Sequence, residues 1–181
     1  MSSYLAPVEK PKGIFIRLGY WYSRKEFGKV FSPLSVFCAR MPTAFTRFYT
    51  TIGKLDKKVA IPAELTTLIR ERVASINSCA YCMDANRFAA IKASATNEKR
   101  FDALDEYESS DLFTAAERAA LDYVTALTRY RAVDADTFAE LARHYDDREI
   151  CGIVYVVASE HVYNLTNIGL NIGSDGLCEV A

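Results

Sequence analysis

SINSCAYCMDANRF, residues 75–88, holds two cysteines, Cys79 and Cys82, separated by two residues. It follows a segment, residues 62–76, that opens with proline and then repeats apolar residues at spacings of three and four. Proline is tolerated in the first turn of a helix, and this spacing is typical of an amphipathic helix. The segment 62–76 is therefore predicted to be a helix whose buried side is formed by Leu65, Leu68, Ile69, Val73 and Ile76.

Two polar residues separate this helix from the next one. Asn77 and Ser78 break the apolar pattern and offer side-chain oxygens that could cap a second helix, which is predicted to run to about Ala93. Cys79 and Cys82 would then lie near the first turn of that helix. Unpaired N–H groups and the helix dipole favour negative charge at this place, and so they favour ionised sulfur.

Helical signals also dominate the rest of the chain, so the fold is predicted to be all-α. Residues 1–32 are rich in aromatic side chains and are expected to form an N-terminal arm with a short helix over 17–27. Residues 33–181 are expected to form a single domain that contains the cysteine pair. Its further helices are predicted over 35–41, 43–55, 98–107 (acidic and exposed), 114–130, 134–144 and 147–170. The last of these contains the β-branched run IVYVV but is long and free of proline.

Length, charge and cysteine usage restrict the class of protein. A chain of 181 residues suits one domain, and a net charge of -1 gives no reason to expect a nucleic-acid or membrane-surface partner. No apolar run reaches the roughly 18 residues that span a bilayer, and the start of the chain lacks a secretory signal. Five scattered cysteines without such a signal indicate a cytoplasmic protein, in which a close pair is more often catalytic or metal-binding than structural.

The cysteine pair has three interpretations, of which redox chemistry is favoured. Two sulfurs at this spacing can close a disulfide with little backbone movement, so that one reacts and the other resolves the product. A structural zinc site needs four ligands, and here there is no second close pair and only two histidines, His144 and His161. Two small core residues are the third interpretation, which the polar neighbours of the pair disfavour. We therefore expect no metal and no cofactor.

The quoted stretch resembles the alkylhydroperoxidase D-like, or carboxymuconolactone decarboxylase, superfamily. RERVASINSCAYCMDANRFAAIKAS, TAAERAALDYVTALTR and DDREICGIVYVVASEHVYN are similar to helices of that family and together span roughly residues 33–172. The resemblance implies an all-α bundle that assembles into homo-oligomers, trimers or hexamers. It also implies the reduction of organic hydroperoxides through the cysteine pair.

The resemblance assigns roles to the two cysteines and leaves two other positions unmatched. Redox-active relatives read Glu, eleven residues, Cys, two residues, Cys, three residues, His. By this resemblance Cys82 would be the peroxidatic thiolate, while Cys79 would supply a proton and close the disulfide. Thr67 and Asn86 occupy the glutamate and histidine positions, and neither side chain titrates near neutral pH.

Other side chains could replace the missing proton relay. Glu71 could face the pair from the preceding helix, or it could be a surface partner of Arg70 and Arg72. His161 has a suitable ordinary pKa for a proton shuttle, although a lone histidine in an apolar helix is more often a hydrogen-bonded core residue. Asn86 could orient a water molecule or hydrogen-bond sulfur without titrating.

These observations predict a thiol-dependent antioxidant enzyme. It would reduce a small alkyl hydroperoxide or a disulfide and would be regenerated by a dithiol reductant protein, with weak peroxidase turnover because the relay is incomplete. A decarboxylase that acts on a small lactone acid and does not need the cysteines is one alternative, and a non-catalytic oligomeric binding protein is another. The aromatic stretch GIFIRLGYWYSRKEF, residues 13–27, is expected to pack on a neighbouring subunit rather than to line a ligand groove.

Overall fold

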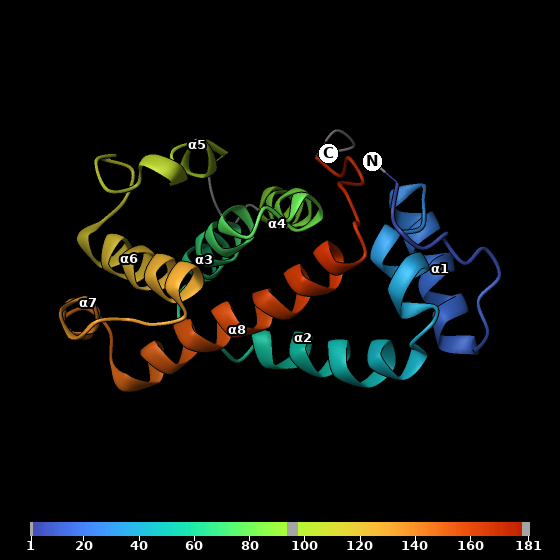
Figure 1. The fold of residues 1–181 in the computed structure, drawn as a ribbon, viewed down its shortest axis with the longest axis horizontal. Coiled ribbons are helices and arrows are strands. Elements are labelled where there is room, and N and C mark those ends of the chain that lie inside the picture. Colours follow the sequence, from blue (N-terminus) through green and yellow to red (C-terminus); the bar gives the residue numbers. More distant parts are fainter. Residues whose placement is uncertain (1, 94–97, 179–181) are drawn as a thin grey trace.

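The structure is a computed structural model that describes residues 2–93 and 98–178. Within these ranges the chain forms helices and no strand, which confirms the all-α prediction (Figure 1). In Figure 1, α1 lies at one end of the molecule, α7 lies at the other, and α8 runs between them. The α-helices are α1 (Ile14–Phe27), α2 (Thr50–Asp56), α3 (Ala63–Ile76), α4 (Ala80–Lys92), α5 (Glu98–Asp102), α6 (Ala115–Tyr130), α7 (Ala135–Ala142) and α8 (Asp147–Gly169).

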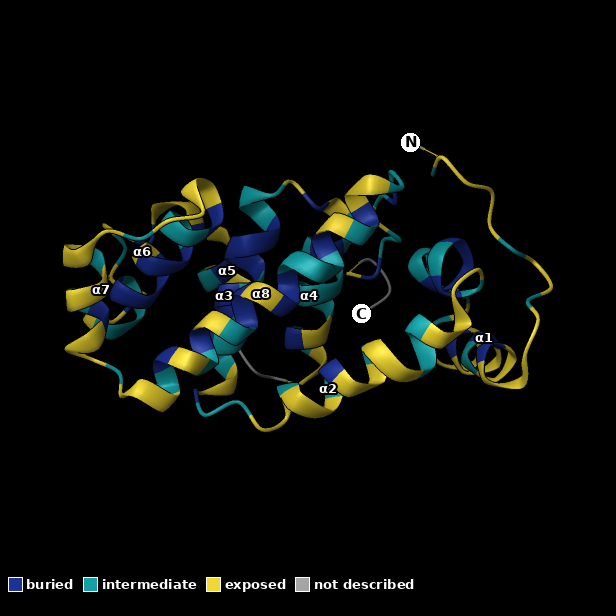
Figure 2. Cartoon of the chain, turned by 60° about the horizontal axis from the view of Figure 1, so that its bottom comes forward, coloured by how far each residue is buried: buried dark blue, intermediate teal, exposed yellow. Residues whose placement is uncertain are grey.

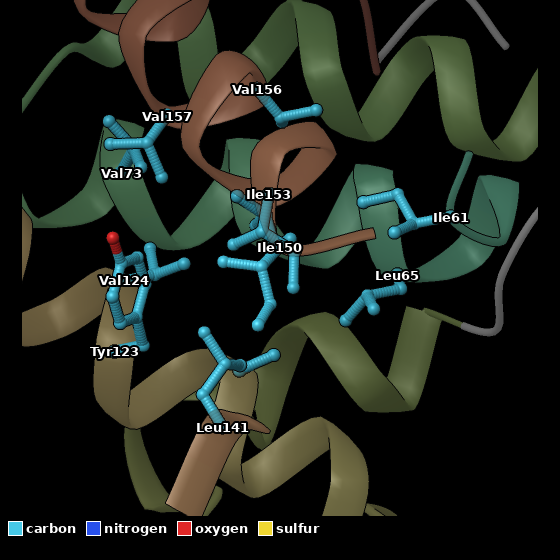
Figure 3. Packing of buried hydrophobic residues seen from close by; sticks show 12 residues of the cluster. Ile61, Leu65, Val73, Tyr123, Val124, Leu141, Ile150, Ile153, Val156 and Val157 are labelled. Atoms are coloured by element: carbon cyan, nitrogen blue, oxygen red, sulfur yellow. The ribbon is translucent and has the colours of Figure 1, made fainter. Parts of the chain in front are cut away.

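Helix α3 is the centre of the packing, since it contacts α4, α6 and α8. Its predicted apolar stripe is buried, apart from the partly exposed Ile76. Leu65, Ile69 and Val73 join residues of α6, α7 and α8 in one core cluster, whereas Leu68 packs in a second cluster with Leu104, Tyr107, Phe113 and Leu121. Figure 3 shows Ile150 and Ile153 of α8 in the first cluster together with Val124 of α6 and Leu141 of α7. Burial of these apolar surfaces provides the main stabilisation of the fold.

The link between α3 and α4 is a Schellman motif. Ser78 takes a left-handed conformation with φ of 56°, and its N–H donates to the Ser75 carbonyl at 2.9 Å. The Cys79 N–H donates to the Ala74 carbonyl, also at 2.9 Å. Two carbonyls left over at the end of α3 are thereby satisfied, and the chain turns directly into α4. Cys79 therefore becomes the residue that precedes α4.

The expected cap of α4 by Asn77 or Ser78 is wrong. No side chain caps α4, because Cys79 holds the capping position and the Asn77 amide is used elsewhere, on α8. Other helices do have side-chain caps: Thr114 and Asp146 each form a capping box, and Asp134 accepts hydrogen bonds from the first turn of α7. The IVYVV run lies inside α8, as predicted, because tertiary burial outweighs its strand propensity.

Two predicted helical segments differ in detail from the structure. Residues 35–41 and 43–55 contain π-helical pieces, η1 (Leu34–Cys38) and η2 (Ala44–Tyr49), and η2 continues into α2. The region 98–107 divides into α5 and a 3-10 turn, η3 (Leu104–Glu106). The expectation that it is exposed is wrong, because Phe101, Leu104 and Tyr107 are buried.

The N-terminal arm packs on its own chain. Helix α1 begins at Ile14 rather than near residue 17, and its inner side places Ile16 and Tyr20 against Leu34 and Cys38. The outer side of α1 is largely exposed (Figure 2). Contact of that outer side with a neighbouring subunit stays a prediction. Among the described residues, none of the helices is long and apolar enough to cross a membrane.

The C-terminal tail ties the arm to α4. Asp84, in the second turn of α4, accepts hydrogen bonds from the Ser174 hydroxyl at 2.6 Å and from the Leu177 N–H at 2.9 Å. Asp175 accepts from the Ser32 hydroxyl at 2.6 Å, at the end of the arm. These bonds hold the arm beside the helix that carries the cysteines. Burial acts to raise the pKa of Asp84, but the hydrogen bonds that Asp84 accepts from the tail outweigh it, so this pKa is lowered.

Two neighbouring positions of α8 test the role of the core. Replacement of Ile153, which has no exposed surface, by alanine is expected to leave a cavity and to lower the free energy of unfolding by about 2–5 kcal/mol. The matched change Val154→Ala, at a position that is 37% exposed, is expected to change it by about 0.5 kcal/mol or less. Urea unfolding followed by circular dichroism measures both values, and equal losses would contradict this account of the core.

Candidate active site

Cys79 and Cys82 are joined by a disulfide, with their Cα atoms 5.3 Å apart. Both residues are buried, at 1% and 4% exposure, and they form a small cluster with Ala74 and Met83. The two cysteines nevertheless differ in surroundings, because Cys82 lines a cavity and Cys79 is not among its lining residues. The sulfur that a small molecule in this cavity would reach is therefore that of Cys82.

The cavity has a volume of about 570 Å³ and lies between the N-terminal arm and the helices α4 and α8. The arm contributes Tyr22 and Phe31 to its wall. The aromatic stretch of the arm thus lines a groove, which is the interpretation that the sequence had disfavoured. Tyr163 of α8 stacks on Tyr49 with ring centroids 5.4 Å apart, and both rings line the same cavity. Most of the wall is apolar and aromatic.

One side of α8 presents polar residues to α3 and α4. Glu160, Asn164 and Asn167 recur at spacings of four and three, so they lie on one face of the helix, and all three are buried. The Asn167 amide donates to the Cys82 sulfur at 3.4 Å. Its Oδ1 atom has no hydrogen-bond partner in the described part of the chain. An amide donor next to sulfur favours the thiolate form.

Glu160 is the residue of this site that sequence reasoning missed. Its carboxylate is 2% exposed and accepts from Arg70 of α3 at 3.0 Å, from Asn86 of α4 at 3.3 Å and from Asn164 at 2.8 Å. Burial raises the pKa of Glu160, while Arg70 and the amide donors act in the opposite direction. The signal in the sequence was the stripe Glu160, Asn164 and Asn167 within an otherwise apolar helix.

Glu71 and His161 were predicted as replacements for the missing proton relay. Neither residue lines this cavity. Glu71 is 2% exposed and accepts from Arg87 of α4 at 2.9 Å. The prediction that Glu71 is a surface partner of Arg70 and Arg72 is therefore wrong. Burial raises the pKa of Glu71 to about 7, despite Arg87. His161 Nδ1 lies 3.0 Å from the Asn77 amide nitrogen, and burial, followed by the charge of Arg131, lowers its pKa.

Thr67 and Asn86, at the two unmatched motif positions, line a common cavity. This second cavity has a volume of about 440 Å³, and Asn86 also lines the first. The Thr67 hydroxyl donates to the Ala63 carbonyl at 2.9 Å. The place that a glutamate and a histidine occupy in redox-active relatives therefore holds two side chains that do not titrate near neutral pH.

The charges at the first cavity are paired with one another. Arg70 forms ion pairs with Asp56 and Glu160, both at 3.0 Å, and all three residues line the cavity. The Arg70 charge is thus already bound by protein carboxylates. A cavity with paired charges and aromatic walls suits an uncharged, mainly apolar molecule. Among residues 2–93 and 98–178, no cluster of three potential metal ligands occurs.

Comparison with protein families places this site in a known context. The model of the carboxymuconolactone decarboxylase family matches residues 40–126, which include the cysteine pair. The uncharacterized protein YnjA of Escherichia coli K12 is 24% identical over 169 residues, and the match covers 92% of each chain.

Solved structures share the fold at low sequence identity. The debrominase Bmp8, crystallised as a cysteine-to-alanine variant with 2,3,4-tribromopyrrole, is 21% identical with a TM-score of 0.80, covering 99% of this chain and 95% of that chain. An uncharacterized peroxidase-related protein from Ralstonia eutropha JMP134, described as an alkylhydroperoxidase AhpD core, is 21% identical with a TM-score of 0.73. That match covers 97% of this chain and 94% of the other.

The hydrogen bond from Asn167 to Cys82 can be tested by alkylation. In the reduced Cys79→Ser protein, the further change Asn167→Leu is expected to slow the reaction of Cys82 with iodoacetamide at pH 7 by about tenfold, because a hydrogen bond to a charged group contributes about 1.5–3 kcal/mol. Mass spectrometry of each cysteine measures the rates. The exposed Cys151 in the same sample is the internal control. An unchanged rate at Cys82 would show that the amide does not stabilise the thiolate.

Proposed function

We propose that this chain, whose residues 40–126 match the carboxymuconolactone decarboxylase family and which has the alkylhydroperoxidase D-like fold, is an oxidoreductase that reduces small hydroperoxides or disulfides through Cys82 and Cys79. The observation that carries the proposal is the position of the pair: Cys82 lines a cavity, while Cys79 is bonded to it from the buried side. This arrangement suits a reacting thiol and a resolving thiol.

The reaction balances with a hydroperoxide as the oxidant. The Cys82 thiolate attacks the terminal oxygen, the O–O bond breaks, and the alkoxide leaves and takes up a proton, so that the products are a sulfenic acid and an alcohol. The Cys79 thiol then attacks the sulfenic sulfur, which releases water and forms the disulfide. Two electrons and two protons from an external dithiol return the pair to its reduced state.

The lining of the cavity favours an uncharged and apolar substrate. Arg70 is engaged by two carboxylates, and aromatic rings form the opposite wall. The Asn167 Oδ1 atom, which is unpartnered and belongs to the amide that contacts Cys82, is suited to accept the O–H of a hydroperoxide. A disulfide lacks that hydrogen. Alkyl or aryl hydroperoxides are therefore the preferred substrate class.

Cysteine variants test the proposal. The reduced protein is expected to consume one equivalent of cumene hydroperoxide, and Cys82→Ser is expected to abolish this reaction. Cys79→Ser is expected to retain it but to form no internal disulfide, while Cys151→Ser, at an exposed position, is expected to react like the parent. Stopped-flow peroxide consumption and mass spectrometry follow these steps.

Other outcomes of that experiment would favour the alternatives. Undiminished activity of Cys82→Ser on a small lactone acid would indicate a decarboxylase. Absence of turnover on peroxides, disulfides and lactone acids would indicate a binding protein.

Reductive debromination is a second candidate, because the debrominase Bmp8 matches 99% of this chain, arm included, and the arm forms the aromatic wall of the cavity. The same pair could exchange a carbon–bromine bond for a carbon–hydrogen bond while the two thiols form a disulfide and hydrogen bromide is released. The measurement is bromide release from a brominated pyrrole. Release that is faster than peroxide reduction and is lost in Cys82→Ser would identify debromination as the main activity.

Restoring the relay is expected to accelerate peroxide reduction. Thr67 and Asn86 line one cavity, so the double change Thr67→Glu with Asn86→His would put a carboxylate and an imidazole in the same cavity, at the positions used by redox-active relatives. General acid–base catalysis contributes about 10²–10⁴-fold in enzymes, and we expect a rise of about tenfold or more. Asn86→His alone is the control. If the folded double variant is no faster than this control, proton transfer does not limit the reaction.

A further inference from the structure

We propose that Glu160 is a catalytic residue that donates the proton to the departing group during reduction at Cys82. This inference rests on the proposed function and concerns the same cavity. It assigns a role to a buried carboxyl group that lies outside the Glu-Cys-Cys-His motif of the relatives.

Two contacts fix the position of Glu160 relative to the sulfur. On α4, Cys82 and Asn86 are four residues apart and share one face of the helix. On α8, Asn167 contacts Cys82 and Glu160 contacts Asn86, so the two helices meet along matching polar faces. Four residues of helix correspond to about 6 Å, and the carboxyl group therefore lies about one turn along α4 from the reacting sulfur.

At this distance from the Cys82 sulfur, the Glu160 carboxyl group is placed to give its proton to the group that leaves the peroxide rather than to the sulfur. Cys82 and Glu160 line the same cavity, and Asn86 lies between their positions along α4. A hydroperoxide whose terminal oxygen meets Cys82 extends its second oxygen and its carbon chain into the space that Glu160 borders. The alkoxide that leaves is a strong base, and a nearby acid lowers the barrier for its departure.

The groups around Glu160 allow it to hold a proton. Arg70 of α3 favours the carboxylate, but Arg70 is shared with Asp56 of α2. Glu71 of α3 is a second buried acid whose negative charge is coupled to that of Glu160. Asn86 of α4 and Asn164 of α8 donate to the carboxyl group and favour the carboxylate, but neither brings a positive charge. Burial itself raises the pKa of Glu160.

The step balances without another reactant. The Cys82 thiolate takes the terminal OH of the hydroperoxide as the O–O bond breaks, the alkoxide oxygen takes the proton of Glu160, and Glu160 is left as a carboxylate that Arg70 stabilises. The carboxylate regains its proton from solvent before the next turnover. Glu71 and His161 border no part of this cavity, so they do not compete for the role.

The test compares two oxidants that differ in the leaving group. Cumene hydroperoxide releases a strongly basic alkoxide, whereas 2,2′-dithiodipyridine, which is neutral and aromatic, releases a stabilised thione that needs little proton assistance. For Glu160→Gln, single-turnover oxidation of the reduced pair by the peroxide is expected to slow by about 100-fold, while oxidation by dithiodipyridine is expected to stay within about twofold. Glu160→Asp, which keeps the acid, is expected to recover part of the peroxide rate.

Glu71→Gln is the matched control, because Glu71 is equally buried and ion-paired but does not line the cavity. It is expected to leave the ratio of the two rates unchanged. Equal slowing with both oxidants in Glu160→Gln, or no slowing with either, would overturn the proton-donor role while leaving the proposed function intact. Failure of the parent protein to react with either oxidant would overturn both.

Discussion

A carboxylate enclosed between three helices is the constraint on which the site depends. Glu160 projects from α8 toward α3 and α4, and a buried carboxyl group needs hydrogen-bond partners. Arg70 supplies one from α3 and Asn86 supplies another from α4. Because these bonds join all three helices, they help to fix the register in which α8 passes the cysteines. The contact from Asn167 to Cys82 follows two turns further along α8.

The fold was predictable where the signals were local. The capping boxes at Thr114 and Asp146 are read directly from residues three positions apart, and the stripe of α3 is a pattern within one helix. The cysteine pair was located at the start of α4 for the same reason. Even there, the link depended on backbone bonds of Ser78 and Cys79, which sequence does not display, and the expected side-chain caps proved wrong.

The site was less predictable because its partners come from distant parts of the chain. Nothing around Glu71 in the sequence indicates Arg87 of the next helix, so its burial was missed. The arm contributes Tyr22 to the cavity and is bonded through Ser32 to Asp175, which lies 143 residues further along the chain. The stripe of Glu160, Asn164 and Asn167 is visible in the sequence, but its partners Arg70 and Cys82 lie on other helices, so its role becomes clear only in the structure.

The most direct test of the central claim is to locate the first oxidised sulfur. Reduced Cys79→Ser protein would be treated with one equivalent of cumene hydroperoxide in the presence of dimedone, which traps sulfenic acids, and the adduct would be located by peptide mass spectrometry. The account predicts a near-stoichiometric adduct on Cys82, since Cys82 borders the cavity and no resolving thiol remains beside it. An adduct confined to Cys38, Cys151 or Cys178, or none at all, would contradict it.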